Sequence, residues 1–123
     1  MPEEMYELLV EERITAYLII MKICPNIKGF KFILNGAKII VNDISKKRNI
    51  NNILYNILAC DFHTDKATID GALRHAIELA DKRDGFKNFV KDFDFAIKGT
   101  RPTPRELLSA LAIKIKNDKD ISL

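Results

Sequence analysis

The chain has few residues that break helices and few that could crosslink a fold. Its 123 residues include four prolines, five glycines and two cysteines. Valine, threonine and tyrosine are sparse beside leucine, isoleucine, alanine and lysine, which favours helices over strands. Cys24 and Cys60 cannot build a disulfide framework and suit a reducing cytoplasm. We therefore expect one all-α domain over residues 1–123, large enough to bury its own core.

Long apolar runs and targeting signals are also missing. The run AYLIIMKI is far shorter than a membrane span, and the acidic start MPEEMYELLVEER lacks the pattern of a signal peptide. We therefore expect a soluble, cytoplasmic protein with no membrane partner. The net charge of +3 permits nucleic-acid binding without indicating it, because a charge excess matters when it is clustered.

The side chains of common catalytic and metal sites do not occur in the required combinations. Catalysis needs a nucleophile with a base, paired carboxylates in a cleft, or a metal. Asp92 and Asp94 would point to different faces of a helix. Cys60, His63 and His75 offer one Cys-x-x-His pair, without a second pair at zinc spacing. We expect no enzymatic activity, no metal and no cofactor.

The stretch from Leu54 to Leu79 has the spacing of a helix-turn-helix. Ala59 is small where a second helix must cross closely, and Ile69 is the apolar residue that packs back against it. Phe62 closes the first helix on its buried side. His63 stands where the turn needs a positive φ, which histidine tolerates better than bulky residues do.

The second helix of this pair has a start signal and one apolar stripe. Thr64 and Asp65 both offer side-chain oxygens to its free amides, so either is a candidate N-cap. Apolar residues then recur at intervals of three and four, and the predicted buried stripe is Ile69, Ala72, Leu73, Ala76, Ile77 and Ala80.

The opposite face of the second helix is the candidate reading surface, and it carries Lys66, Ala67, Asp70, Gly71, Arg74 and Glu78. In a helix-turn-helix, this outer face near the N-terminal end enters the DNA major groove. An ordinary antiparallel helix pair in an all-α core would show the same spacing. Spacing alone therefore leaves both interpretations open.

Two further helices are expected before this stretch. One runs from Glu3 to about Met21, ending ahead of Pro25, with an apolar face of Met5, Leu8, Leu9, Ile14, Leu18 and Met21. The next runs from Ile27 or Lys28 to Val41 and buries Phe30, Ile33, Leu34, Ala37, Ile40 and Val41. A glycine inside a helix costs about 1 kcal/mol relative to alanine, so Gly29 and Gly36 predict close helix contacts.

Two more helices are expected after it. Charges and a glycine at residues 81–85 predict the end of the second helix. A short helix then follows with Phe86, Phe89, Val90, Phe93 and Phe95. The last helix runs to about Lys116, with Thr103 as N-cap, Pro104 at its first position and Glu106 at its third. The expected fold is a compact bundle of about five to six helices containing a helix-turn-helix.

Motifs in a common order carry a family resemblance. ALRHAIELA at residues 72–80, led by the TxxxxID run from Thr64, resembles the recognition helix of the C-terminal effector domain of the master sporulation transcription factor of endospore-forming bacteria. IKGFKFILNGAKIIVND, ILYNILACDF and RPTPRELLSALAIKI resemble other segments of that domain. We expect an effector-like region at residues 12–118 and an N-terminal helical extension at residues 1–11.

The resemblance implies roles for individual residues. Asp70 occupies the position of a base-reading glutamate, and His75 follows Arg74 as in the family. Gly71 stands where the family has a base-reading arginine, a contact worth roughly 1–3 kcal/mol of discrimination. Lys28 matches the lysine of the family's IKG motif. The family's phosphorylated receiver domain is not part of this sequence, so we expect its switch to be absent or supplied by another protein.

The chemistry of the side chains suggests how DNA would be read. The Arg74 guanidinium can bond two acceptors on guanine or clamp a phosphate, and Asp70 can accept from the amino group of cytosine. Basic and hydroxyl residues near a helix start suit phosphates. The candidate DNA-binding residues are Lys66, Thr68, Asp70, Gly71, Arg74, His75, Lys28, Lys46, Lys47 and Arg48.

Two functions remain open at this stage. The first is sequence-specific binding of double-stranded DNA by a transcriptional regulator, with a homodimer on DNA among the arrangements that the resemblance implies. The alternative is a protein-interaction module of the same fold, which modulates RNA polymerase or another regulator without reading DNA. Gly71 motivates the alternative. A basic strip broken by Asp65 and Asp70 would favour it.

Overall fold

A computed structural model describes residues 1–45, 53–87, 101–118 and 120–121. These residues form five α-helices and no strand: α1 (Glu3–Ile20), α2 (Lys28–Ser45), α3 (Leu54–Asp61), α4 (Lys66–Lys82) and α6 (Pro104–Asn117). The all-α prediction is confirmed. The expected short helix after Phe86 lies outside the described residues, except for Phe86, which is buried, and Lys87.

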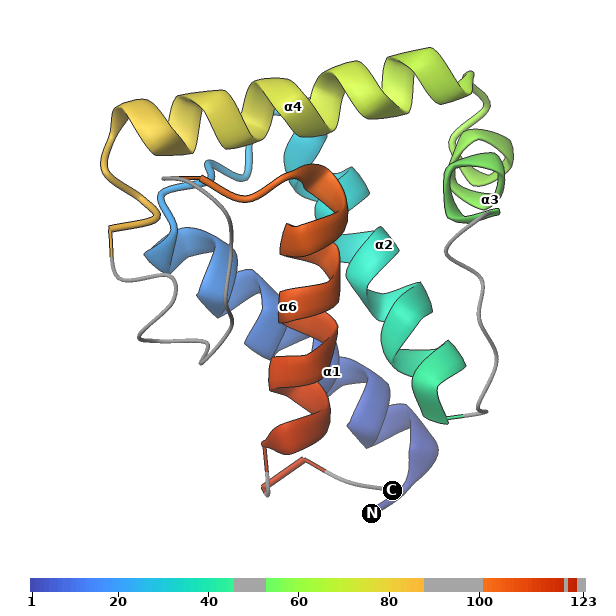
Figure 1. The fold of residues 1–123 in the computed structure, drawn as a ribbon. Coiled ribbons are helices and arrows are strands. Elements are labelled where there is room, and N and C mark those ends of the chain that lie inside the picture. The colour runs from blue at the N-terminus through green and yellow to red at the C-terminus, as the bar shows by residue number, and fades with distance from the viewer. Residues whose placement is uncertain (46–52, 88–100, 119, 122–123) are drawn as a thin grey trace.

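Helix α2 is the centre of the bundle, because it packs against α1, α3, α4 and α6. Helices α1, α2 and α6 run beneath α4, which lies across one end of them (Figure 1). The fully buried side chains come from every layer, and include Ile14, Leu18, Ile33, Leu58, Ile69, Leu73, Leu107, Leu111 and Ile115. Leu34 and Ala72, which we expected to be buried, are half-buried at the edge of this core.

The two glycines of α2 lie at helix crossings, as their positions predicted. A Cβ atom on Gly29 would lie 2.5 Å from the carbonyl oxygen of Ala72 and 2.6 Å from the Cβ of Ala76, both on α4. A Cβ atom on Gly36 would lie 3.2 Å from a methyl group of Leu108 on α6. The absent side chains therefore allow α2 to contact both neighbours closely.

Three helices end in the same backbone motif. The residue after each C-cap has a positive φ: Lys22 after α1 (62°), His63 after α3 (53°) and Asp84 after α4 (57°). The next amide then bonds a carbonyl of the last helical turn, which is the Schellman arrangement. These bonds join Ile23 to Leu18, Thr64 to Ala59, and Gly85 to Ala80, at 2.8–2.9 Å. The predicted positive φ of His63 is confirmed.

The predicted apolar face of the first helix is confirmed for Ile14, Leu18 and Met21, which are buried, and wrong for Met5 and Leu8. Met5 and Leu8 are 52% and 61% exposed, whereas Tyr6, Val10, Ile14 and Leu18 are buried. At about 3.6 residues per turn, these two sets lie on opposite faces of α1. The helix is apolar on both faces, so periodicity could not decide between them.

The C-terminal residues are held against α1. Arg13 Nη1 bonds Asp118 Oδ2 at 2.8 Å, and Arg13 Nη2 bonds Asp120 Oδ2 at 2.7 Å. The Tyr17 hydroxyl donates to Asp118 Oδ2 at 2.7 Å. Helix α6 begins with the predicted capping box, in which Thr103 and Glu106 bond each other's backbone amides.

Candidate DNA-binding surface

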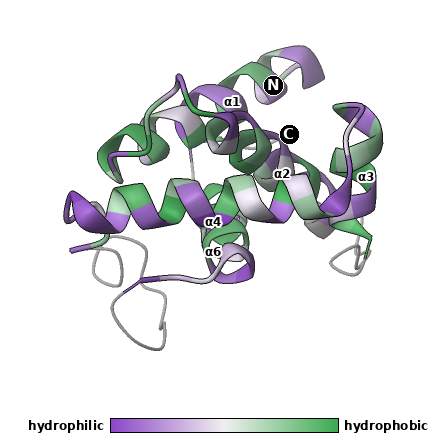
Figure 2. Ribbon diagram, turned by 90° about the horizontal axis from the view of Figure 1, so that it is seen from above, coloured by the Kyte–Doolittle hydropathy of each residue, from purple (hydrophilic) through white to green (hydrophobic). Residues whose placement is uncertain are grey.

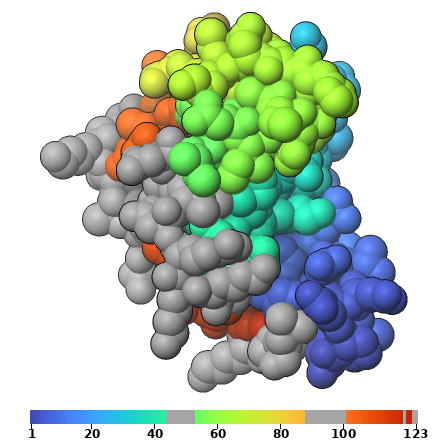
Figure 3. Space-filling model, turned by 90° about the vertical axis from the view of Figure 1, so that its right-hand side faces the viewer, coloured from blue at the N-terminus to red at the C-terminus, as the bar shows by residue number. Residues whose placement is uncertain are grey.

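Helices α3 and α4 form a helix-turn-helix at one end of the molecule. Ala59 on α3 and Ile69 on α4 are buried where the helices meet, as predicted. Phe62, at the C-cap of α3, is half-buried and packs edge-on against Phe32 of α2, with ring centroids 5.1 Å apart. Figure 3 shows α3 and the start of α4 at the end of the molecule opposite the start of α1.

The N-cap of α4 is Asp65, one of the two candidates. The backbone amide of Thr68 donates to Asp65 Oδ1 at 2.7 Å, and this bond lowers the pKa of the Asp65 carboxyl. The carboxylate thus takes one of the amides that a bound phosphate could have used. The side chains of Lys66 and Thr68 remain exposed beside it.

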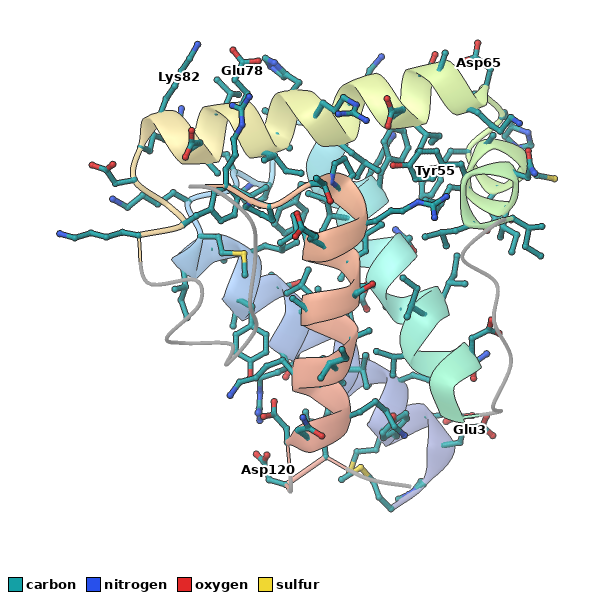
Figure 4. The ribbon with its side chains drawn as sticks, in the orientation of Figure 1. Glu3, Tyr55, Asp65, Glu78, Lys82 and Asp120 are labelled. Atoms are coloured by element: carbon teal, nitrogen blue, oxygen red, sulfur yellow. The ribbon has the colours of Figure 1, made fainter. Side chains whose placement is uncertain are left out.

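Charged residues of alternating sign follow the outer face of α4 at four-residue intervals. The series is Lys66, Asp70, Arg74, Glu78 and Lys82. Arg74 Nε bonds Asp70 Oδ2 at 2.7 Å, and Lys82 Nζ lies 3.2 Å from Glu78 Oε1. Glu78 and Lys82 point away from the bundle in Figure 4, and the Lys82 ammonium lowers the pKa of the Glu78 carboxyl.

Asp70 also has a partner on α3. The Tyr55 hydroxyl donates to Asp70 Oδ1 at 3.2 Å, while Arg74 holds the other carboxylate oxygen. Burial of the Tyr55 ring and the neighbouring Asp70 carboxylate raise the pKa of the Tyr55 hydroxyl to about 12. Figure 4 shows Tyr55 in the angle between α3 and α4. Both carboxylate oxygens of Asp70 are therefore engaged within the protein.

Most of the predicted site residues lie on one outward face. Lys66, Thr68, Gly71, Arg74 and His75 are exposed, and Asp70 is half-buried. In Figure 2, which looks down onto α4, hydrophilic and hydrophobic residues alternate along the helix and none of the labelled helices lies over it. The exposed Lys28 is the first residue of α2, next to the crossing with α4. Lys46, Lys47 and Arg48 lie outside the described residues.

Two arginines near the start of α6 join this surface and were missed in the sequence. Arg101 Nη1 lies 3.8 Å from Asp81 Oδ2, near the C-terminal end of α4. Arg105 lines a small cavity together with Tyr55 of α3. Both are exposed. They flank the capping box in RPTPR, and this pairing of cations with a helix start is the signal that could have revealed them.

Gly71 faces open space. A Cβ atom built on it would meet no other atom within 4 Å. This glycine therefore meets no packing requirement, unlike Gly29. A larger side chain at this position would project from the outer face of α4, beside Asp70.

The described residues show neither a metal site nor a membrane span. No three His, Cys, Asp or Glu side chains among them gather in a way that could hold a metal ion. None of their helices combines the length and the apolar character needed to cross a bilayer.

A short helix, a tight turn and a second helix with an exposed polar face are the features of a helix-turn-helix domain. Residues 14–115 match the family model described as "Sporulation initiation factor Spo0A C terminal". The chain belongs to this family, which consists of DNA-binding domains of a transcription regulator and is not an enzyme family. The resemblance noted in the sequence is confirmed.

Proposed function

We propose that the protein binds double-stranded DNA sequence-specifically, with α4 in the major groove, as a transcriptional regulator related to sporulation control. The observation that carries this proposal is the exposure of Arg74. Its side chain is 66% exposed in the middle of the outer face of α4. A guanidinium there can reach the acceptors on a guanine edge.

The flanking cations and the hydroxyl of Thr68 suit the DNA backbone. Lys66 and Thr68 lie at the start of α4, Lys28 lies at its crossing with α2, and Arg101 and Arg105 lie on the α6 side. Lysine and arginine contacts to phosphates supply affinity and set the register of a protein on the duplex. We assign base reading to Arg74 and phosphate binding to these flanking residues.

The test is selection of bound duplexes from a random pool, followed by titration of the winning sequence. Arg74→Ala should weaken binding to that duplex by about tenfold to a hundredfold and relax preference at one base. Lys28→Ala should weaken binding to selected and random duplexes alike, and reduce the slope of affinity against salt by about one.

Lys38 provides the matched control for Lys28. It lies on the same helix, about 15 Å further along by helical rise, where it pairs with Glu11 at 3.6 Å. Lys38→Ala should leave DNA binding unchanged. If Arg74→Ala and Lys28→Ala both bind like the wild-type protein, the proposed function is wrong.

The mixed charge of α4 favours a second candidate, a protein-interaction module. Asp65 lies next to Lys66 and Asp70 lies between Lys66 and Arg74, so both carboxylates interrupt the basic strip, and Gly71 offers no side chain for reading. Such a module would bind RNA polymerase or another regulator. A wild-type protein that enriches no duplex, but binds purified polymerase or a full-length regulator in a titration, would support this candidate.

A further inference from the structure

We propose that Tyr55 is a positioning residue for DNA reading: through Asp70 it holds the Arg74 guanidinium in the orientation that contacts a guanine. This inference rests on the proposed function and adds a specificity determinant outside the reading helix. The geometry that carries it is a chain of two hydrogen bonds. Tyr55 donates to Asp70 Oδ1 at 3.2 Å, and Arg74 donates from Nε to Asp70 Oδ2 at 2.7 Å.

The chain runs from a packed element outward to solvent. Tyr55 lies half-buried on α3, the Asp70 side chain is 35% exposed, and the Arg74 side chain is 66% exposed. Tyr55 packs against the hydrophobic core, and each hydrogen bond links it to a more exposed side chain. Asp70 and Arg74 lie one turn apart on α4, the spacing at which side chains on a helix meet.

The bond to Asp70 leaves the reading atoms of Arg74 available. It uses the Nε–H group, whereas the two terminal nitrogens carry four further N–H donors. A bidentate contact with guanine O6 and N7 needs two such donors. A long surface arginine loses rotamer freedom when it binds, and a guanidinium that is already oriented loses less.

The same geometry gives Asp70 two partners within the protein, which leaves one lone pair on each of its carboxylate oxygens. Each of its carboxylate oxygens already accepts a bond from Tyr55 or Arg74. The phenol hydroxyl is a neutral donor, so removing it changes the orientation of Asp70 without changing the charge of the surface. Tyr55→Phe therefore tests the orientation of Arg74 alone, whereas a neutral substitution of Asp70 would also change the charge of the surface.

The experiment measures base preference at the position that Arg74 reads. That position is the one at which Arg74→Ala loses the preference found for the wild-type protein by selection. Affinities are then measured by fluorescence anisotropy for the selected duplex and for its three single-base variants there. Tyr55→Phe should reduce the preference for guanine by about three- to tenfold. Affinity for a random duplex and the salt slope should stay within about twofold of wild type.

Two further variants make the result specific. Tyr17→Phe removes a hydroxyl bonded to Asp118, where the C-terminal residues meet α1, and should leave the preference unchanged. Tyr55→Phe combined with Arg74→Ala should match Arg74→Ala alone, because a positioning residue has nothing left to position. If thermal unfolding shows that Tyr55→Phe does not fold, Asp70→Asn replaces it, and the guanine preference is again compared as a ratio.

Three outcomes would overturn the inference. A Tyr55→Phe protein with the full wild-type preference would show that the hydroxyl does not orient Arg74. A repeat of the selection with Tyr55→Phe that shows the loss of preference at a different base from the one Arg74 reads would assign Asp70 to direct reading. A wild-type protein that selects no sequence would overturn the proposed function and this inference together, whereas the first two outcomes leave the proposed function in place.

Discussion

Gly29 of α2 touches the backbone of α4 at Ala72, where a Cβ atom on the glycine would lie 2.5 Å from the carbonyl oxygen. Real Cβ atoms do not approach a carbonyl so closely, so only glycine permits this crossing. The contact lies on the inner side of α4, opposite the face that carries Arg74. The distance between α2 and α4 is therefore set by the absence of a side chain on Gly29.

Gly29 and Gly71 should respond in opposite directions to alanine. Gly29→Ala must push α4 away from α2, which should lower the free energy of unfolding by about 1–3 kcal/mol. Gly71→Ala meets open space and removes the entropic cost of a helical glycine, so it should raise that free energy by about 0.5–1 kcal/mol. Urea unfolding of both variants measures this difference. Equal effects of the two substitutions would contradict the crossing described here.

The end of α4 offers a second pair of substitutions. Asp84 has a φ of 57°, which glycine adopts without strain, so Asp84→Gly should stabilise the fold by about 0.5–1 kcal/mol. Gly85→Ala should destabilise it, because the added Cβ would overlap the carbonyl oxygen of Met21. Thermal unfolding compares the two directly. A stabilised Gly85→Ala protein would show that the segment after α4 packs differently.

A cation added at residue 71 should strengthen DNA binding if α4 enters the major groove. Gly71→Arg has room to project beside Arg74, and should raise affinity for duplex DNA with an increase of about one in the salt slope. Gly71→Ala, which gives the same helical gain without the charge, is the control. Selection from a random pool then shows whether the arginine adds a preferred base. An unchanged affinity for Gly71→Arg would place DNA on another face.

The tyrosines predict a loss of stability in alkali. Burial has the largest effect on both hydroxyls. Together with neighbouring carboxylates, it raises the pKa values of Tyr17 and Tyr55 to about 12, from an ordinary value of about 10. The folded state thus favours the protonated hydroxyls. Their contribution to stability is complete below pH 10 and is lost as the pH rises from about 10 through about 12.

Two measurements check this alkaline behaviour. Absorbance at 295 nm should show a component with a midpoint near pH 12 that Tyr55→Phe and Tyr17→Phe each reduce. The urea midpoint of the wild-type protein should fall across this range, and fall less in the double variant. If neither substitution removes a high-pH component, the hydrogen bonds of the two hydroxyls do not persist in solution.

Local rules were sufficient for the helix ends and for one face of most helices. Thr103, Pro104 and Glu106 predicted the start of α6, and His63 predicted the left-handed turn before α4, because these features depend on a few adjacent residues. The same rules failed on the first half of α1. Met5 and Leu8 are as apolar as the residues buried opposite them, so only the position of α2 and α6 decides which face is covered.

The candidate site shows the same division. The residues on its outer face could be predicted from the four-residue spacing of Lys66, Asp70 and Arg74, since one helix places them on a common face. The partnership of Asp70 with Tyr55, and the presence of Arg105 nearby, could not be read in this way. Both relationships join residues on different helices, and a local sequence pattern does not show which residues of different helices come together.

Local patterns along the chain were enough to show that the protein is helical, where most of its helices begin and end, and which family it belongs to, because backbone propensities, caps and motifs each depend on neighbouring residues. The packing of the helices was needed to show how closely α2 approaches α4, which residues in the first half of α1 are buried, and which side chains bond Asp70. Those features depend on how side chains pack between helices that are distant in the chain, and therefore on the shapes of both contacting surfaces.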